Sequence, residues 1–198
     1  MWYAAHGFYA HIQKPIVIDK SRGWGHNIGV IKKVFPENTK FIATVRSIPD
    51  ILASFVTLAN NNKMNYIDQT LYKLGNQNIS NKDRCEWLVS KSGTLFESWD
   101  SFRFAWDNFR DNICIVEYDT LLLQPQKEMD RIYDFIGIDA FHHDFSNIIN
   151  QTPENDSIYG IDGMHDVRKQ LTRSSINPIS VLGEDLYHQY NGGHFWRE

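Results

Sequence analysis

The sequence has few cysteines, no long apolar run and no excess of positive charge. Its two cysteines, Cys85 and Cys114, lack the spacing of a metal site or a redox motif, and so low a content favours a reducing compartment. Residues 1–7 lack the basic-then-apolar pattern of a signal peptide. No stretch reaches the roughly 18 apolar residues that a membrane span needs. We therefore expect a cytoplasmic protein without a membrane span.

The charge balance restricts the partners further. A net charge of −4 gives no general attraction to nucleic acid or to an anionic membrane, so we expect neither as a partner. Any anion site must come from a local concentration of arginine and lysine. A metal site is also not expected, because His142 and His143 are adjacent and cannot easily share one face.

What the chain does have is enough apolar sequence for one α/β domain over residues 1–198. Three short apolar runs are typical of strands buried on both faces: 16–19, 41–45 and 113–118. Helical patterns occupy residues 2–12, 28–34, 48–59, 87–109, 125–136 and 185–190, and the polar residues 63–81 read as an irregular lid with a short helix. This alternation predicts a central parallel sheet covered by helices on both faces, a three-layer arrangement.

The most informative stretch follows the second apolar run. Arg46 comes directly after it, Ser47 and Asp50 form a capping box for the next helix, and Ser54 is eight residues after the arginine. A guanidinium at the carboxyl end of a buried strand, beside the N–H groups of a helix start, suits a phosphate. Arg46 and Ser54 are therefore candidate phosphate ligands, and the alternative is an exposed arginine and an ordinary helical serine.

A second basic cluster, Lys20–Ser21–Arg22, follows the first apolar run. Because the carboxyl ends of parallel strands meet at one edge of a sheet, we expect this cluster to open beside Arg46. A lysine there can offset negative charge that builds up on a transferred group. The alternative is a solvated run of charges.

Four motifs occur in the order 18–24 (IDKSRGW), 45–54 (VRSIPDILAS), 116–121 (VEYDTL) and 132–138 (IYDFIGI). As an ordered set they resemble the sulfotransferases that use 3′-phosphoadenosine 5′-phosphosulfate (PAPS). The likeness extends over residues 15–141 and is greatest to bacterial and phage-like members related to the tyrosylprotein and carbohydrate enzymes. The tail also looks like the end of such members, in residues 163–168 (GMHDVR) and 195–197 (FWR).

The resemblance implies a role for each candidate residue. Arg46 and Ser54 match the ligands of the nucleotide 3′-phosphate, Tyr118 lies near the nucleotide, and Lys20 lies beside the sulfuryl group. Arg22 occupies the position of a histidine base in many members, but arginine stays protonated, so it is better read as an anion clamp. The late basic loop makes Arg168 a further contact to the nucleotide. The general base is open among the candidates Asp19, His6 and His26.

The resemblance also implies a P-loop-NTPase-like sulfotransferase fold that is N-terminally incomplete. The family begins with a strand and a Ser-Gly-Thr loop around the 5′-phosphosulfate, and no such segment precedes Trp2. Residues 91–94 (KSGT) match that loop by letter but stand in a helical segment, so we interpret the match as coincidence. We expect a truncated piece that retains the 3′-phosphate half of the cofactor site.

Three functions follow as hypotheses. The first is sulfuryl transfer from PAPS, without a metal, to a hydroxyl or amine, with a carbohydrate or peptide favoured by the polar composition of residues 63–81. The second is a nucleotide kinase-like enzyme of the same architecture, which lacks a visible glycine-rich loop ending in Lys-Ser/Thr. The third is a noncatalytic nucleotide-binding remnant.

Overall fold

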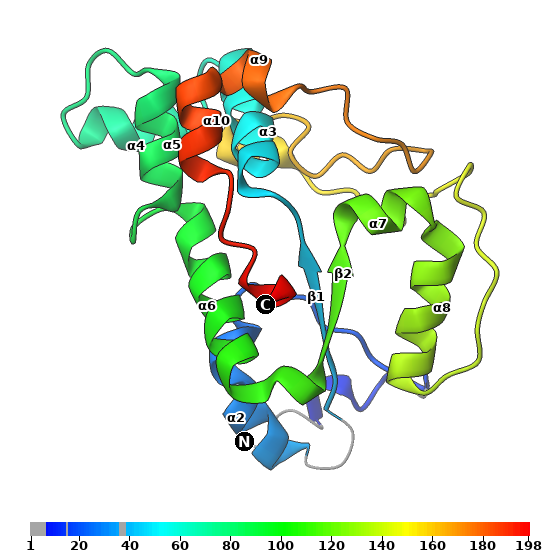
Figure 1. Cartoon of the computed structure of the whole chain (residues 1–198). Helices are drawn as coiled ribbons and strands as arrows, with labels where there is room; N and C mark the ends of the chain where they lie inside the picture. Colours follow the sequence, from blue (N-terminus) through cyan, green and yellow to red (C-terminus); the bar gives the residue numbers. More distant parts are fainter. Residues whose placement is uncertain (1–6, 15, 36–38) are drawn as a thin grey trace.

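The computed structural model describes residues 7–14, 16–35 and 39–198, and in that part of the chain two parallel strands lie between groups of helices (Figure 1). Strand β1 (Phe41–Val45) pairs with β2 (Ile113–Glu117) in a register that sets Phe41 opposite Ile113 and Val45 opposite Glu117. Both strands are rich in β-branched residues, which favour a pleated, half-buried surface. The central parallel pairing that the sequence predicts is confirmed.

The largest core lies beyond the carboxyl ends of the strands. Helices α3 (Ile48–Asn61), α4 (Tyr66–Lys73), α5 (Asn81–Val89), α9 (Pro178–Leu182) and α10 (Glu184–Tyr190) gather there in Figure 1. Their buried side chains form one apolar cluster, which includes Leu52, Val56, Ile67, Leu88 and Leu186. This cluster holds α3, and therefore the end of β1, in place.

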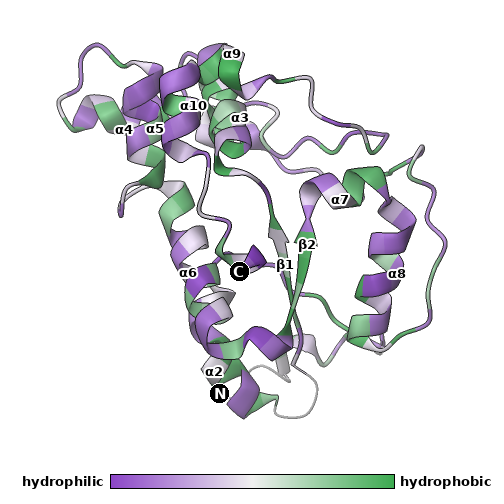
Figure 2. Cartoon of the chain, in the orientation of Figure 1, coloured by the Kyte–Doolittle hydropathy of each residue, from purple (hydrophilic) through white to green (hydrophobic). Residues whose placement is uncertain are grey.

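The other helices flank the sheet. Helix α2 (Trp24–Val34) packs on α6 (Thr94–Phe109), and α7 (Tyr118–Leu123) and α8 (Pro125–Ile136) follow β2. Short 3₁₀ turns lie at Arg110–Asn112, Asp156–Tyr159 and Phe195–Arg197. Figure 2 shows β2 largely hydrophobic, whereas α8 carries both hydrophilic and hydrophobic residues, as expected for a helix with one face toward the sheet.

Local signals in the sequence explain the best-predicted elements. Ser47 caps α3 by accepting the Asp50 N–H at 3.3 Å, and Pro49 lies in the first turn, as predicted. Helix α8 begins at Pro125 and ends at Gly137, whose φ of 79° suits glycine.

One predicted strand is wrong. Residues 16–19 form no regular secondary structure, and Val17 and Ile18 are 41% and 73% exposed. An apolar run makes a strand only where another strand satisfies its backbone groups, and no described strand pairs with this one. Of the predicted helix over residues 2–12, residues 2–6 lie outside the described residues, whereas residues 7–9 are helical and residues 10–11 form a turn.

Two other segments differ from the expectation. Residues 63–81 contain the predicted short helix, α4, but its Ile67 and Leu71 are part of the core, so the segment is packed into the domain and is not a lid over it. The single long helical pattern is two helices, separated around Gly93, where a Cβ atom would lie 1.9 Å from the carbonyl oxygen of Trp87. Gly93 therefore lets the backbone of residues 91–94 pass close to the end of α5. This packing explains the glycine of the KSGT sequence.

The described sheet has two strands, so the full three-layer, P-loop-NTPase-like arrangement stays a prediction. Among the described residues, no helix combines the length and the apolar character that crossing a bilayer requires.

Candidate functional site

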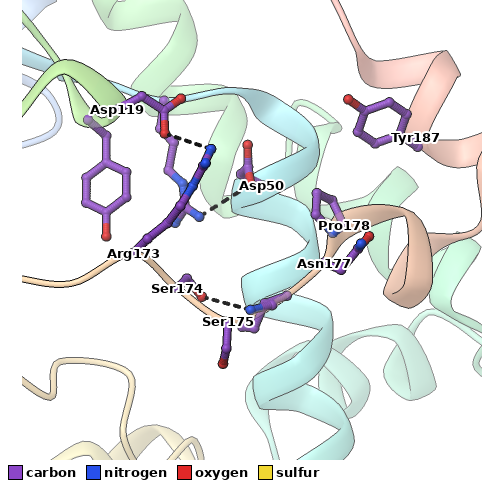
Figure 3. Close-up of a pocket in the computed structure, with 11 residues that line it drawn as sticks. Asp50, Asp119, Arg173, Ser174, Ser175, Asn177, Pro178 and Tyr187 are labelled. Carbon is purple, nitrogen blue, oxygen red and sulfur yellow. Dashed lines mark hydrogen bonds and ion pairs between the residues drawn. The ribbon is translucent and has the colours of Figure 1, made fainter. Parts of the chain in front are cut away.

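A pocket of about 320 Å³ lies where β1 and β2 end (Figure 3). Three parts of the chain contribute to it: the start of α3, the junction between β2 and α7, and residues 173–178 before α9 together with Tyr187. Ligands collect at the carboxyl ends of parallel strands because loops and helix N-termini converge there. The lining residues are Arg46, Asp50, Tyr118, Asp119, Arg173, Ser174, Ser175, Ile176, Asn177, Pro178 and Tyr187.

The register of the sheet brings Arg46 and Tyr118 together. Val45 pairs with Glu117, so the residue after each strand lies beside the other. The guanidinium carbon of Arg46 is 4.7 Å from the centre of the Tyr118 ring, a cation–π contact. The two residues are 72 positions apart in the sequence, and strand pairing alone makes them neighbours.

Asp50 holds Arg46 from the other side. One Arg46 nitrogen is 3.5 Å from Asp50 Oδ1, and the side chains of Arg46 and Asp50 are 23% and 29% exposed, respectively. Asp50 also donates its backbone N–H to the Ser47 cap. The start of α3 therefore orients the guanidinium, and the positive end of the helix dipole adds to the attraction for an anion.

Arg173 is the functional candidate that sequence reasoning missed. Its guanidinium is 3.5 Å from Asp119, which it faces in Figure 3. Ser174 Oγ accepts the Ile176 N–H at 3.3 Å, and Asn177 caps α9. The sequence signal was a basic residue followed by serines and a helix cap, RSSINP, which places hydroxyls and N–H groups beside a cation.

The structure places the predicted contact Arg168 elsewhere. Arg168 is exposed, donates to the Thr172 carbonyl at 3.2 Å and does not line the pocket. Ser54 is half-buried on α3 and does not line the pocket either. Asp50, one turn earlier on the same helix, is the residue that contacts Arg46. Arg46 and Tyr118 are thus brought together, and Ser54 lies one turn beyond them.

Lys20 and Arg22 do not reach this pocket. Both are exposed and precede α2. Burial raises the pKa of Tyr66, while the hydrogen bond from Thr94 and the charge of Arg22 act in the opposite direction. Gly23, the residue after Arg22, lies beside α6, because a Cβ atom there would be 3.8 Å from Glu97 Oε1. The expectation that both basic clusters open beside each other depended on the strand at 16–19, which is not formed.

The candidate bases have partners of their own. Asp19 accepts hydrogen bonds from Tyr9 Oη at 2.5 Å and from Trp24 Nε1 at 2.8 Å. His26 pairs with Asp100 at 3.2 Å. His6 lies outside the described residues. The general base therefore stays open among these three.

The pocket has the chemistry of a phosphate site. Two guanidiniums can each offer paired N–H donors to phosphate oxygens, and serine hydroxyls and the Asn177 amide can add further donors. Asp50 and Asp119 balance the arginines, so the lining charges cancel before an anion enters. The described residues hold no group of three or more metal-ligating side chains.

Comparison with known proteins identifies the family. The model of the sulfotransferase family matches residues 3–143, more than half of the chain. The match includes β1, α3 and β2, and with them Arg46 and Tyr118. Searches of curated proteins and of solved structures found no match. The chain belongs to the sulfotransferase family.

Proposed function

We propose that this protein transfers a sulfuryl group from PAPS to a hydroxyl or amine and that the pocket at the strand ends holds the 3′-phosphate of the nucleotide. The observation that carries the proposal is the Arg46–Tyr118 contact at the carboxyl ends of two paired strands, within one pocket. Family membership supports sulfuryl transfer, and the residues of the pocket support a phosphorylated donor.

The residues fit a ribose-linked phosphate. Arg46 and Arg173 both line the pocket, and two guanidiniums can bind a dianion together. The Tyr118 ring, already under one guanidinium, offers an apolar wall to the sugar or the base. A volume of about 320 Å³ suits the phosphoribosyl end of the donor rather than the whole molecule.

The other predicted residues have proposed roles around this anchor. Ser54 lies on the same helix as Asp50, one turn deeper, and is a proposed donor to the phosphate if Arg46 moves toward α3. Arg168 is a proposed contact from the loop that leads to Arg173. Lys20 would offset the charge of the leaving phosphate, and Arg22 would clamp the sulfonate or an acidic acceptor.

The transfer itself needs positioning and charge compensation. The acceptor oxygen or nitrogen forms a bond to sulfur as the bond from sulfur to the 5′-phosphate oxygen breaks, and adenosine 3′,5′-bisphosphate leaves. The acceptor loses its proton to a base. Fixing the nucleotide by its 3′-phosphate supplies the orientation for this in-line attack.

A carbohydrate or peptide is the proposed acceptor class. Helix α4 and its flanks expose polar residues together with Met64 and Tyr72, which are 72% and 67% exposed. An exposed aromatic ring beside amide side chains can stack on a sugar or a peptide and also form hydrogen bonds with it, which a deep apolar pocket cannot do.

Calorimetry with adenosine 3′,5′-bisphosphate tests the site. We expect the wild-type chain to bind it and Arg46→Ala to bind it far more weakly. The matched control is Arg110→Ala, because Arg110 also lies over an aromatic ring, Trp106, at 4.3 Å, but outside the pocket. Absence of binding by the folded wild-type chain, or equal losses in both variants, would overturn the proposal.

A transfer assay separates an enzyme from a remnant. The chain is incubated with PAPS labelled on sulfur and with carbohydrate or tyrosine-peptide acceptors, and labelled product is measured. Product formation that disappears in Arg46→Ala supports the sulfotransferase. Nucleotide binding without transfer to any acceptor would support the noncatalytic alternative.

A further inference from the structure

Three consecutive residues at the end of β2 each contact an arginine from a different part of the chain. The arginines come from the C-terminal residues, from the end of β1 and from the loop before α9. Their contacts are an ion pair, a cation–π contact and a second ion pair. The pairs are Glu117–Arg197, Tyr118–Arg46 and Asp119–Arg173.

The first pair belongs to residues 194–197, here called the C-terminal strap. Arg197 binds Glu117 through two nitrogens, at 2.7 and 2.6 Å, the forked geometry that makes such pairs strong. Trp196 Nε1 donates to the same carboxylate at 3.1 Å. Glu117 thus holds three donors from the last residues of the chain.

The strap is also fixed to α6. Phe195 is buried, and its ring centre lies 5.1 Å from that of Phe102 and 5.8 Å from that of Trp99. The Arg103 guanidinium lies over the same ring at 4.8 Å. In Figure 1 the C-terminus lies between α6 and the strands, so the strap ties the helix to the end of the sheet.

We propose that the C-terminal strap positions the nucleotide site: Arg197 and Trp196, by fixing Glu117, hold the Tyr118 ring where Arg46 lies over it. The inference rests on the proposed function, because its measured effect is on nucleotide binding. Arg197 and Trp196 are positioning residues and need not touch the nucleotide.

The chain geometry gives the strap this leverage. Glu117 is the last residue of β2 and the cap of α7, with φ −75° and ψ 125°, and Tyr118 is the first residue of the helix. No side-chain hydrogen bond caps α7, so the orientation of this junction depends on what holds Glu117. A ring that is held in place before the ligand arrives need not be ordered on binding, which strengthens binding.

The Glu117 carboxylate is ionised when it is needed. The hydrogen bond from Arg197 lowers its pKa, outweighing partial burial, and the Trp196 N–H acts in the same direction as Arg197. The strap therefore stays paired at neutral pH.

Binding of adenosine 3′,5′-bisphosphate to the full chain tests the proposal. We expect Arg197→Ala to weaken binding about fivefold and Trp196→Phe, which keeps the ring but removes the N–H, about twofold. The matched control is Arg131→Ala, which removes an Arg–Glu pair of 2.7 Å that lies away from the pocket. All affinities are measured well below the unfolding transition of each variant.

A second background separates positioning from general loss of stability. In Tyr118→Leu, which lacks the ring, Arg197→Ala should weaken binding no further. Equal effects of Arg197→Ala and Arg131→Ala, or multiplied effects of Arg197→Ala and Tyr118→Leu, would overturn the proposal. Should Arg197→Ala fail to fold, Trp196→Phe and Arg197→Lys give the same comparison with smaller losses.

The two proposals fail differently. If the wild-type chain does not bind the nucleotide, the proposed function fails. If it binds, and Arg46→Ala strongly weakens binding while the strap variants match their control, the strap inference alone fails.

Discussion

Two pockets of similar size lie along β2 and show why residue type alone does not make a site. The first, at the carboxyl end, has a volume of about 320 Å³, and the second, near the amino end, about 370 Å³. Each contains two arginines, one of them over an aromatic ring, at 4.7 Å for Arg46 and 4.3 Å for Arg110.

Their surroundings differ. The second pocket is walled by apolar side chains of β2 and α8, including Ile113, Ile115 and Phe135. Its other arginine, Arg131, is used internally, on Glu128, Cys114 and the Ile115 carbonyl. The first pocket has serines, an asparagine and the start of α3 beside loosely paired arginines. The first pocket therefore offers more polar donors to an anion, whereas the second has an apolar wall and one of its two arginines bonded internally.

The largest expected effect separates the two cation–π arginines. Arg46→Ala should weaken binding of adenosine 3′,5′-bisphosphate roughly 50-fold, the loss of charge-assisted bonds to phosphate. Arg110→Ala should change it less than about twofold, since Arg110 does not line the site. Calorimetry measures both, and a comparable loss in Arg110→Ala would show that the comparison between the pockets is mistaken.

The second prediction concerns stability. Arg131→Ala should lower the free energy of unfolding by about 2 kcal/mol, because the Glu128 side chain, 10% exposed, loses its partner. The control Lys82→Ala removes the exposed pair with Glu86 and should cost less than about 0.5 kcal/mol. Urea denaturation gives both values. If Arg131→Ala instead impaired nucleotide binding at full stability, the second pocket would be functional.

The third prediction tests the late loop. Arg173→Ala should weaken nucleotide binding about five- to tenfold, less than Arg46→Ala because Arg173 is 80% exposed and more easily screened. Arg168→Ala is the comparison variant and should cause a smaller loss, since its side chain donates to the Thr172 carbonyl outside the pocket lining. A larger loss in Arg168→Ala than in Arg173→Ala would favour the assignment made from sequence.

The smallest effect is a pH dependence at the end of β2. The Arg197 hydrogen bond lowers the pKa of Glu117 below its ordinary 4.5, so the pair stabilises the fold above that pH and the contribution is lost as pH falls through the folded value. On acidification the wild type should therefore lose more stability than Arg197→Ala does. The difference should be less than about 1 kcal/mol, since the pair is partly exposed. Thermal melts from pH 6 to pH 3 measure the difference, and parallel curves would contradict it.

Local signals predicted the elements that support the first pocket. Short-range chemistry accounts for strand 41–45, the Ser47 cap and the Pro125 and Gly137 boundaries of α8. It also predicts a strand over 113–118, which in the structure ends one residue earlier, at Glu117. Arg46 could be proposed from sequence because it directly follows a strand, whereas Tyr118, the last residue of the predicted strand 113–118, was proposed from the family resemblance. Their contact needed only the parallel pairing that the alternation of elements predicts.

Long-range features were not predictable in the same way. The apolar run at 16–19 has the composition of a strand, but a strand also needs a hydrogen-bonding partner, which composition does not report. The choice between Arg168 and Arg173 depended on how an irregular loop crosses the pocket. Such paths are set by many weak contacts rather than by periodicity.

By itself the sequence determined which segments become strands and capped helices around the pocket, since capping, β-branching and apolar periodicity act over a few residues. It also determined the family, through an ordered set of motifs within residues 3–143. Only the tertiary structure decided that Arg173 lines the pocket, that Lys20 and Arg22 lie away from it and that the last residues of the chain hold Glu117. Those contacts join parts of the chain far apart in sequence, so their geometry depends on packing of the whole domain.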